Sequence, residues 1–324
     1  ADNNTAIGSA ALEANTTGYT NTAVGKEAGK SITTGYGNTA LGSDSLEANQ
    51  TGIYNTAVGL SSLGNTTGSN NTGVGFGSGA STTSGTSCVF VGSYAGLSNT
   101  TGDNNTIVGR ASLYSNTTGG NNTALGYGTL LANTTASNNT AIGYNSLTAN
   151  TTGANNTAVG GSSLAANTTA DSNTGIGYFS LAANTTGASN TGLGKGTVRS
   201  NTTGSNNTGV GLDCMNGNTT GSNNTGLGSN ALAANSTASN NTACGKDALA
   251  TNTTGSENTA IGTFAMDAHT TGDSNTALGV NALGSNTTAS NNTALGRNAM
   301  VNNTEGFQNV AVGAYCLDAN TTGD

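Results

Sequence analysis

The sequence contains no proline and no tryptophan, and it has one histidine and four cysteines among its 324 residues. Only 7% of the residues are charged, and the formal net charge is -8. Because nucleic-acid-binding proteins gain much of their affinity from basic stripes, which this chain lacks, we expect no nucleic-acid partner. No apolar run approaches the roughly 20 residues of a membrane-spanning helix, so we expect no membrane insertion.

Side chains suited to catalysis are scarce. His269 is the only histidine, and it stands where most repeats of the chain have asparagine, so a substituted asparagine is favoured over a catalytic base. Four aspartates share one repeat position but lie several repeats apart (Asp2, Asp103, Asp171 and Asp273). Calcium-binding solenoids instead repeat a carboxylate in every turn. We therefore predict that the chain is not an enzyme and has no metal site and no cofactor.

The four cysteines do not predict a disulfide. Cys214 and Cys316 occupy the same repeat position but are six repeats apart. Stacked repeats about 4.8 Å apart would separate this pair by roughly 28 Å, far beyond disulfide reach. We interpret the cysteines as small core residues, and interchain bonding is the lesser alternative.

A five-residue phrase, Asn-Thr-Ala-aliphatic-Gly, recurs along the whole chain. Its last residue, here called the anchor glycine, defines position 0 of each repeat. Successive anchors are 17 residues apart, except that Gly59 and Gly75 are 16 apart. A fixed period of this kind indicates a repeat architecture, which grows by adding units rather than by enlarging one core. The nineteen anchors are Gly8, Gly25, Gly42, Gly59, Gly75, Gly92, Gly109, Gly126, Gly143, Gly160, Gly177, Gly194, Gly211, Gly228, Gly245, Gly262, Gly279, Gly296 and Gly313.

Two apolar columns are the predicted core. The residue at position -1 is aliphatic in 18 of 19 repeats, and we call this set the aliphatic column. Position +4 holds leucine in twelve repeats and is called the leucine column. The predicted core residues are Ile7, Leu12, Val24, Leu147, Val159 and Leu164.

The spacing favours strand over helix. Thr-x-aliphatic alternates with period two, and asparagine, glycine and threonine disfavour helix elsewhere. We predict one strand at Thr-Ala-Val-Gly, a second near Ala-Leu, and a turn at Asn-Thr-Thr-Gly. The predicted fold is all-β, a β-solenoid of the β-roll or β-helix kind with about nineteen 17-residue coils. It forms one continuous domain over residues 1–324, without separate caps.

Asparagine fills two further columns. The first asparagine column lies four residues before the anchor and is asparagine in 18 of 19 repeats. The second lies ten residues before the anchor and is asparagine in 15 of 18 repeats counted from Asn15. Stacked asparagine side chains can hydrogen-bond along a fibre axis, so we predict a structural ladder. Its representatives are Asn4, Asn21, Asn38, Asn105, Asn156, Asn207, Asn258 and Asn309.

Many of these asparagines lie in Asn-x-Thr sequons, and Asn15, Asn116 and Asn184 are candidate glycosylation sites. The alternative is that an asparagine ladder beside threonines creates sequons as a by-product. We favour the alternative, because the columns persist where the sequon is lost, as at Asn21.

The variable positions +1 and +2 gather aromatic residues and indicate an exposed face. A sugar-binding or surface-binding stripe is one interpretation, and scattered surface aromatics are the favoured one. The candidate stripe residues are Tyr127, Tyr144, Tyr178 and Phe179.

Position -2, here called the small-residue column, is alanine or glycine in all repeats but those of Phe90 and Ile107. Together with the anchor glycine it forms a ribbon without bulk on one face of the strand. We expect this ribbon to admit the backbone of another chain, as in a trimer, or of an adjacent sheet.

The phrase Asn-Thr-Ala-Val-Gly-x-x-Ala-Leu-x-x-Asn-Thr-Thr-Gly resembles the repeats of phage tail-fibre-like proteins. More distantly, it resembles the head repeats of trimeric autotransporter adhesins, and the resemblance covers the whole chain. It implies a left-handed β-roll, often trimeric, that serves as a shaft or an adhesive head outside the cell.

We therefore expect a structural subunit of an extracellular fibre or filament, located outside the cell, on its surface or on a virion. Ala1 and Gly323 share one repeat position, so we expect subunits to stack head to tail, or to form a homotrimer. One alternative is an adhesin or tail-fibre shaft that binds cell-surface glycans through the variable face. A second alternative is an ice-binding solenoid, because threonine columns on a flat face can order water.

Overall fold

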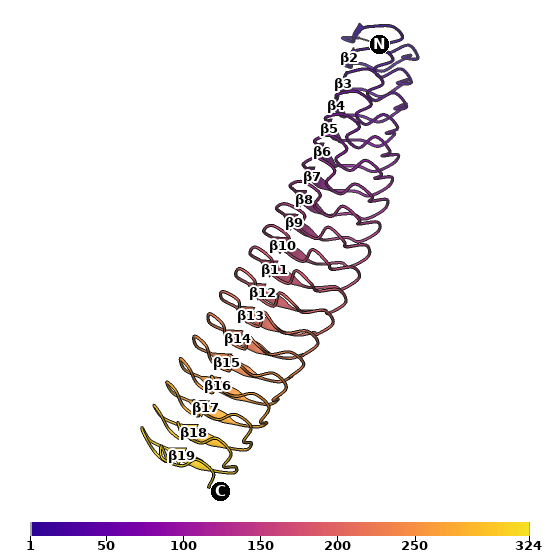
Figure 1. Cartoon of the computed structure of the whole chain (residues 1–324). Coiled ribbons are helices and arrows are strands. Elements are labelled where there is room, and N and C mark those ends of the chain that lie inside the picture. Colours follow the sequence, from indigo (N-terminus) through magenta and orange to yellow (C-terminus); the bar gives the residue numbers. More distant parts are fainter. Residues whose placement is uncertain (1, 324) are drawn as a thin grey trace. The chain divides into compact units, whose positions relative to one another are not determined.

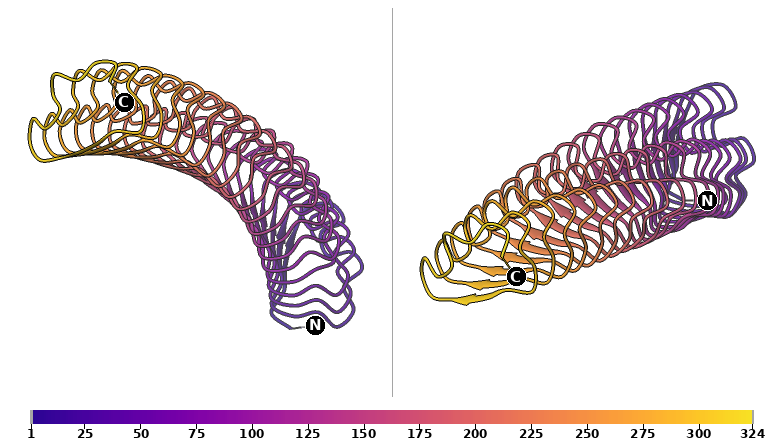
Figure 2. Two further views of the ribbon diagram at one scale, coloured as in Figure 1. Left: turned by 90° about the horizontal axis from the view of Figure 1, so that it is seen from below. Right: turned by 60° about the horizontal axis from the view of Figure 1, so that its bottom comes forward.

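The computed structural model describes residues 2–323. It contains nineteen strands of three residues each and no helix among the described residues. The chain divides into two compact units, residues 1–157 and 158–324, and each is described by itself. In both units one coil follows another and each coil contributes one strand (Figures 1 and 2), which confirms the predicted all-β solenoid.

All strands begin at position -3 and end at position -1. The strands of residues 1–157 are β1 (Thr5–Ile7), β2 (Thr22–Val24), β3 (Thr39–Leu41), β4 (Thr56–Val58), β5 (Thr72–Val74), β6 (Val89–Val91), β7 (Thr106–Val108), β8 (Thr123–Leu125) and β9 (Thr140–Ile142). The tenth strand, β10 (Thr157–Val159), includes the last residue of the first unit. The strands of residues 158–324 are β11 (Thr174–Ile176), β12 (Thr191–Leu193), β13 (Thr208–Val210), β14 (Thr225–Leu227), β15 (Thr242–Cys244), β16 (Thr259–Ile261), β17 (Thr276–Leu278), β18 (Thr293–Leu295) and β19 (Val310–Val312).

Within each unit, consecutive strands pair in parallel with identical repeat positions opposite one another. In the first unit Ala23 faces Ala40, and in the second Ala260 faces Ala277. The N–H of Gly25 donates to the carbonyl of Ile7 on the preceding coil at 2.8 Å. The constant repeat length therefore becomes a constant register, and each sequence column becomes a row of stacked side chains.

The anchor glycine is required twice over. Gly25 has a φ of 140°, which side-chain-bearing residues rarely adopt. A Cβ added to Gly25 would also lie 2.5 Å from the carbonyl oxygen of Gly42 on the next coil. The backbones approach so closely here that no side chain fits between the coils.

The second predicted strand, near Ala-Leu, is absent from the described residues. The leucine column lies in turns and its residues have positive φ, for example 53° at Leu12 and 50° at Leu147. The N–H of Leu46 still donates to the carbonyl of Ser62 on the next coil, at 3.2 Å. The left-handed conformation bends the chain and prevents a strand, while hydrogen bonding between coils continues.

The leucine column is the core, as predicted. Leu147 and Leu164 have no exposed surface, and Leu12, in the first coil, is 9% exposed. This burial offsets the cost of about 1–2 kcal/mol that a side-chain-bearing residue has in the left-handed region.

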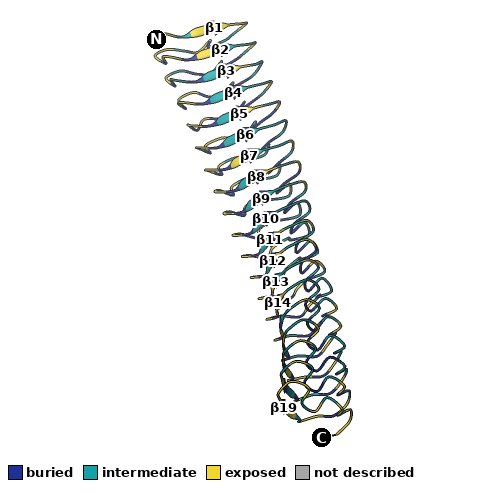
Figure 3. Ribbon diagram, turned by 90° about the vertical axis from the view of Figure 1, so that its left-hand side faces the viewer, coloured by how far each residue is buried: buried dark blue, intermediate teal, exposed yellow. Residues whose placement is uncertain are grey.

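The prediction that the aliphatic column belongs to the core is wrong. Ile7 is 60% exposed, and Val24 and Val159 are half-buried. Figure 3 shows the first strands of residues 2–157 in the colours of half-buried and exposed residues. Because side chains alternate across a strand, burying position -2 turns positions -3 and -1 outward.

The small-residue column faces the interior, so the expectation that it admits another chain is also wrong. Ala158 has no exposed surface. A Cβ added to Gly175 would lie 2.6 Å from Ser163 Oγ and 3.3 Å from Leu164 Cγ. Only small residues fit opposite the leucine column, which is why the bulkier aliphatic side chains point outward.

Larger residues enter the interior where the leucine column is glycine. Gly79 and Gly96 replace the leucine of their coils, and Phe90 fills the space between them. A Cβ added to Gly79 would lie 2.7 Å from Phe90 Cδ2, and one added to Gly96 would lie 3.0 Å from Ile107 Cδ1. Ile32 fills the corresponding space beside Gly29, with Cδ1 2.9 Å from an added Cβ. Interior volume is conserved although the side chain that supplies it changes position.

The 16-residue repeat shifts one column. Counting back from Gly75 assigns Asn65 to the second asparagine column, but Asn65 is exposed and Thr66 is fully buried. The N–H of Thr66 donates to the carbonyl of Leu63, as the N–H of Asn49 does to that of Leu46. The missing residue therefore lies after the column, and threonine occupies the asparagine site in this coil.

Candidate functional site

The first asparagine column forms a buried ladder along each stack of coils. Asn21 Oδ1 accepts a hydrogen bond from the backbone N–H of Asn38 at 3.0 Å. Asn21 Nδ2 donates to the carbonyl of Gly35 at 2.9 Å, and Asn38 Nδ2 donates back to Asn21 Oδ1 at 3.1 Å. One amide thus bonds the backbone of the next coil twice, which confirms the asparagine ladder.

Members of this ladder differ in burial only near the ends of the described chain. Asn4 and Asn309 are half-buried. The other named members are buried, with at most 1% of their surface exposed: Asn21, Asn38, Asn105, Asn156, Asn207 and Asn258.

The second asparagine column bonds amide to amide and contains the candidate glycosylation sites. Asn116 Nδ2 donates to Asn99 Oδ1 at 2.7 Å and to the carbonyl of Gly119 at 2.9 Å. Asn184 likewise donates to Asn167 Oδ1 at 2.9 Å. Asn116 and Asn184 have no exposed surface, so in the folded chain neither amide is accessible to a glycosyltransferase. Asn15, in the first coil, is half-buried.

Two of the ladder sites that lack asparagine hold titratable residues. His269 is fully buried in the second column, where Nε2 lies 2.7 Å from the carbonyl oxygen of Gly272 and Nδ1 has no hydrogen-bond partner. Burial lowers the pKa of His269. Cys88 replaces an asparagine of the first column and donates to the carbonyl of Gly102 at 3.3 Å. Burial raises the pKa of the Cys88 thiol to about 11, so the thiol is protonated and poorly nucleophilic. His269 occupies an asparagine position, as predicted, but breaks the amide-to-amide chain, because Asn252 Oδ1 before it has no partner. Cys88 keeps a hydrogen bond at its ladder position and is buried, as expected for a small core residue.

All four cysteines are free. Burial raises the pKa of the Cys214 thiol to about 12, which suits a small core residue. Among residues 2–323, no group of three or more histidine, cysteine, aspartate or glutamate side chains could hold a metal ion. The described chain also contains no helix long and apolar enough to cross a membrane.

The outward face of the strands carries two rows of side chains. Threonine at position -3 and the aliphatic column at position -1 both point to solvent, in register from coil to coil. Within the second unit, Leu193, Leu227 and Leu278 are 38%, 48% and 42% exposed. We call this surface the outward strand face. Sequence reasoning placed its aliphatic residues in the core and therefore missed it.

The residues of the predicted aromatic stripe form two pairs, in which Tyr127, Tyr144 and Tyr178 are exposed and Phe179 is half-buried. In the first unit, Tyr127 and Tyr144 are 46% and 61% exposed and stack with ring centroids 5.5 Å apart. The guanidinium of Arg110 lies 5.7 Å from the Tyr127 ring centroid. In the second unit, the ring centroids of Tyr178 and Phe179 are 4.1 Å apart, and Tyr178 is 53% exposed.

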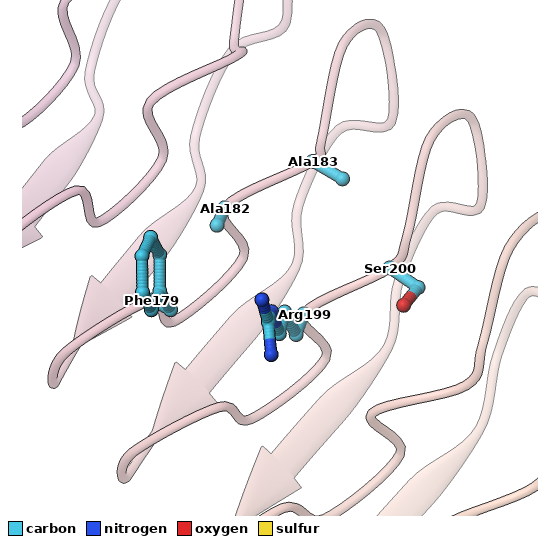
Figure 4. Close-up of a pocket in the computed structure, with 5 residues that line it drawn as sticks. All are labelled: Phe179, Ala182, Ala183, Arg199 and Ser200. Atoms are coloured by element: carbon cyan, nitrogen blue, oxygen red, sulfur yellow. The ribbon is translucent and has the colours of Figure 1, made fainter.

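An open hollow of about 310 Å³ lies beside the second pair. Phe179, Ala182 and Ala183 from one coil and Arg199 and Ser200 from the next line it (Figure 4). The Arg199 guanidinium carbon is 5.0 Å from the Phe179 ring centroid. A flat apolar ring and a forked cation therefore meet at one small space, with Ser200 on its rim.

The sequence predicts Tyr178 and Phe179 as site residues but not Arg199, because positions +2 and +5 become neighbours only when coils stack. The comparisons with known proteins add no relative: no family model matches the chain, and no curated protein matches it.

Proposed function

We propose that the chain is a structural element of an extracellular fibre, in which copies pack side by side through the outward strand face. The observation that carries the proposal is the exposed aliphatic column of this face. The lateral contact is compatible with both the filament and the homotrimer expected from the sequence.

The outward strand face lacks the features that keep sheets apart. None of the nineteen strands contains a charged residue. Soluble β-proteins commonly place charges on exposed sheet surfaces to prevent association, and continuous exposed apolar patches commonly mark interaction sites. The exposed leucines of the second unit, Leu193, Leu227 and Leu278, lie in one column, and half-buried Val210 and Cys244 are among the residues between them.

A second copy of the chain is the partner that best fits this face. A surface that repeats once per coil is matched along its length only by a partner with the same repeat distance. Another copy supplies that distance, and rows of threonine and aliphatic side chains can interdigitate as in stacked sheets about 10 Å apart. The buried asparagine ladders support this role, because they hold successive coils together within one chain without a partner.

The test places charges on the face. Leu227→Lys combined with Leu278→Lys introduces two desolvated cations into a lateral contact and should shift the chain towards monomer. Thr237→Lys combined with Thr254→Lys is the matched control, because both threonines are exposed at position -8, away from the strands. Sedimentation velocity and negative-stain microscopy report the assembly state.

We expect oligomers or bundled fibres for the wild type and the control, and smaller species for the leucine variant. A wild-type chain that stays monomeric at high concentration would refute the proposal. An unchanged oligomer in the leucine variant would refute this face as the contact.

Ice binding is a second candidate, favoured by the regular row of outward threonines beside aliphatic groups. Thr225 and Thr276 of the second unit are exposed and lie in register with their neighbours. An ice-recrystallisation assay on the same variants tests this function. Inhibition that is lost in the leucine variant supports it, and no inhibition by the wild type excludes it.

A further inference from the structure

We propose that the hollow between Phe179 and Arg199 is a binding site for a carboxylated sugar unit of an acidic glycan. This inference goes beyond the fibre role, and neither depends on the other. A volume of about 310 Å³ lies at the lower end of the range for small-ligand sites, roughly 300–1,000 Å³. The hollow therefore suits one small unit of a polymer rather than a folded partner.

The cation that lines the hollow, Arg199, is available to a ligand. Within residues 2–323, the ion pairs join Lys26 and Lys30 to Glu27, and Lys246 to Asp247. Arg199 and Lys195 belong to one coil, are both exposed, and form no ion pair with the described residues. An arginine whose guanidinium stacks on a ring keeps N–H donors in its own plane, where they can bind a carboxylate through two parallel hydrogen bonds.

The surroundings of the hollow have a simple cause in the repeat. Position +2 is Phe179 in one coil and Gly196 in the next, so no side chain follows Phe179 in that row. Position +5 is Ala182 in one coil and Arg199 in the next, which leaves the floor low and places the cation beside it. The carboxylate of Asp213, on the following coil, lies directly against Gly196 and would collide with a Cβ at that position. Arg199 is the one cation among the residues that line the hollow, and none of those residues is a carboxylate.

The apolar part selects a sugar over an acidic peptide. The ring of Phe179 and the methyl groups of Ala182 and Ala183 form a low apolar surface, and Tyr178 packs against the Phe179 ring. The C–H face of a pyranose ring is flat and apolar and matches it, while ring hydroxyls can bond Ser200. A carboxylate carried on that ring would reach Arg199. An aspartate or glutamate side chain offers the carboxylate but no rigid apolar ring beside it.

The test measures the binding of trigalacturonate to the full chain by titration calorimetry or NMR. We expect a dissociation constant on the order of 1 mM, as befits one open site. Arg199→Ala and Phe179→Ala should each weaken binding at least tenfold, and Arg199→Lys should weaken it because lysine lacks the planar fork. Arg297→Ala is the matched control, because Arg297 also stacks on a ring, 6.0 Å from Tyr315, and should leave binding unchanged.

The neutral trisaccharide maltotriose should bind at least tenfold more weakly than trigalacturonate. No binding of trigalacturonate would overturn the inference, and so would unchanged binding by Arg199→Ala. A loss of binding in Arg297→Ala as large as that in Arg199→Ala would overturn it too. Equal or tighter binding of a sulfated oligosaccharide or of triglutamate would also overturn it, since each would show attraction to charge alone. The leucine-to-lysine variant of the outward strand face should bind trigalacturonate as the wild type does, which separates this test from that of the fibre.

Discussion

His269 interrupts the second asparagine column, and replacing it with asparagine should stabilise the chain. In regular coils each side-chain oxygen of this column accepts from the next amide, as Asn218 Oδ1 does from Asn235 Nδ2 at 2.8 Å. Asn252 donates normally to Asn235 Oδ1 at 3.0 Å, but its own Oδ1 has no partner because His269 follows it. His269 Nδ1 is also without a partner, and both side chains are fully buried.

His269→Asn removes both unsatisfied atoms. The new Nδ2 can donate to Asn252 Oδ1 and to the carbonyl of Gly272, as its counterparts do on other coils. An unsatisfied buried polar atom costs about 1–3 kcal/mol. The smaller asparagine gives up some packing of the imidazole ring, so we expect a net gain of about 1–3 kcal/mol in the free energy of unfolding.

The variant should also lose a dependence on pH. Burial lowers the pKa of His269 in the folded chain below its ordinary value of 6.5, while the unfolded chain keeps about that value. Between these two pKa values the unfolded state binds a proton and the folded state does not, so stability rises with pH. The wild type should therefore lose stability as pH falls from about 6.5 through the folded pKa. His269→Asn should remove this loss, and its advantage should widen on acidification.

Hydrogen exchange of the amides in the coils around His269, at pH values from 7.5 down to 5, measures the effect locally, because repeat proteins need not unfold in two states. Asn184→His is the reciprocal control, since Asn184 sits in an intact stretch of the column and accepts from Asn201 Nδ2 at 2.7 Å. It should destabilise its own coils and make them acid-sensitive. Equal protection of wild type and His269→Asn at every pH would refute the ladder argument, as would a harmless Asn184→His.

Three further substitutions test the packing. Phe90→Ala should lower the free energy of unfolding by about 3–5 kcal/mol, because Gly79 and Gly96 leave nothing to fill the cavity. Adding Gly96→Leu should recover part of this loss. A double variant no more stable than Phe90→Ala would contradict this account. Leu147→Asp should destabilise the chain by several kcal/mol, because it buries an unpaired charge. Thr135→Asp, on the exposed surface, should change the stability little. Equal melting temperatures of the two variants would refute the core assignment. Gly25→Ala should be strongly destabilising, because its Cβ would lie 2.5 Å from the carbonyl oxygen of Gly42. Gly64→Ala should be mildly destabilising, because no atom would lie closer than 3.5 Å to its Cβ. Thermal unfolding compares the two variants, and similar losses of stability would contradict the close approach of the coils.

The sequence by itself determined the solenoid, because the period is a one-dimensional property. A constant 17-residue repeat with Thr-x-aliphatic at one place leaves stacked coils with a parallel strand at that place as the consistent arrangement. The second strand expected near Ala-Leu was wrong, because the left-handed backbone of the leucine column is not visible in the period. The asparagine ladder followed from the same register, since identical residues at one position must stack. The leucine column followed from its apolar character.

Only the tertiary structure decided which side of the strand faces inward. By hydrophobicity, the aliphatic column should be buried and the small-residue column exposed, and the opposite holds because the leucine column already fills the interior. One signal in the sequence pointed the right way: Phe90 and Ile107, the two bulky residues of the small-residue column, occur next to coils with Gly79 and Gly96 in place of leucine. That exchange shows that the two columns share one space.

The tertiary structure also decided which variable residues meet. Phe179 and Arg199 are twenty residues apart in the sequence and belong to different columns, so no periodicity links them. Stacking brings position +2 of one coil beside position +5 of the next, and the hollow exists because Gly196 and Ala182 are small. The repeat specifies the coil, but the exceptions to the repeat become a site only through contacts between coils.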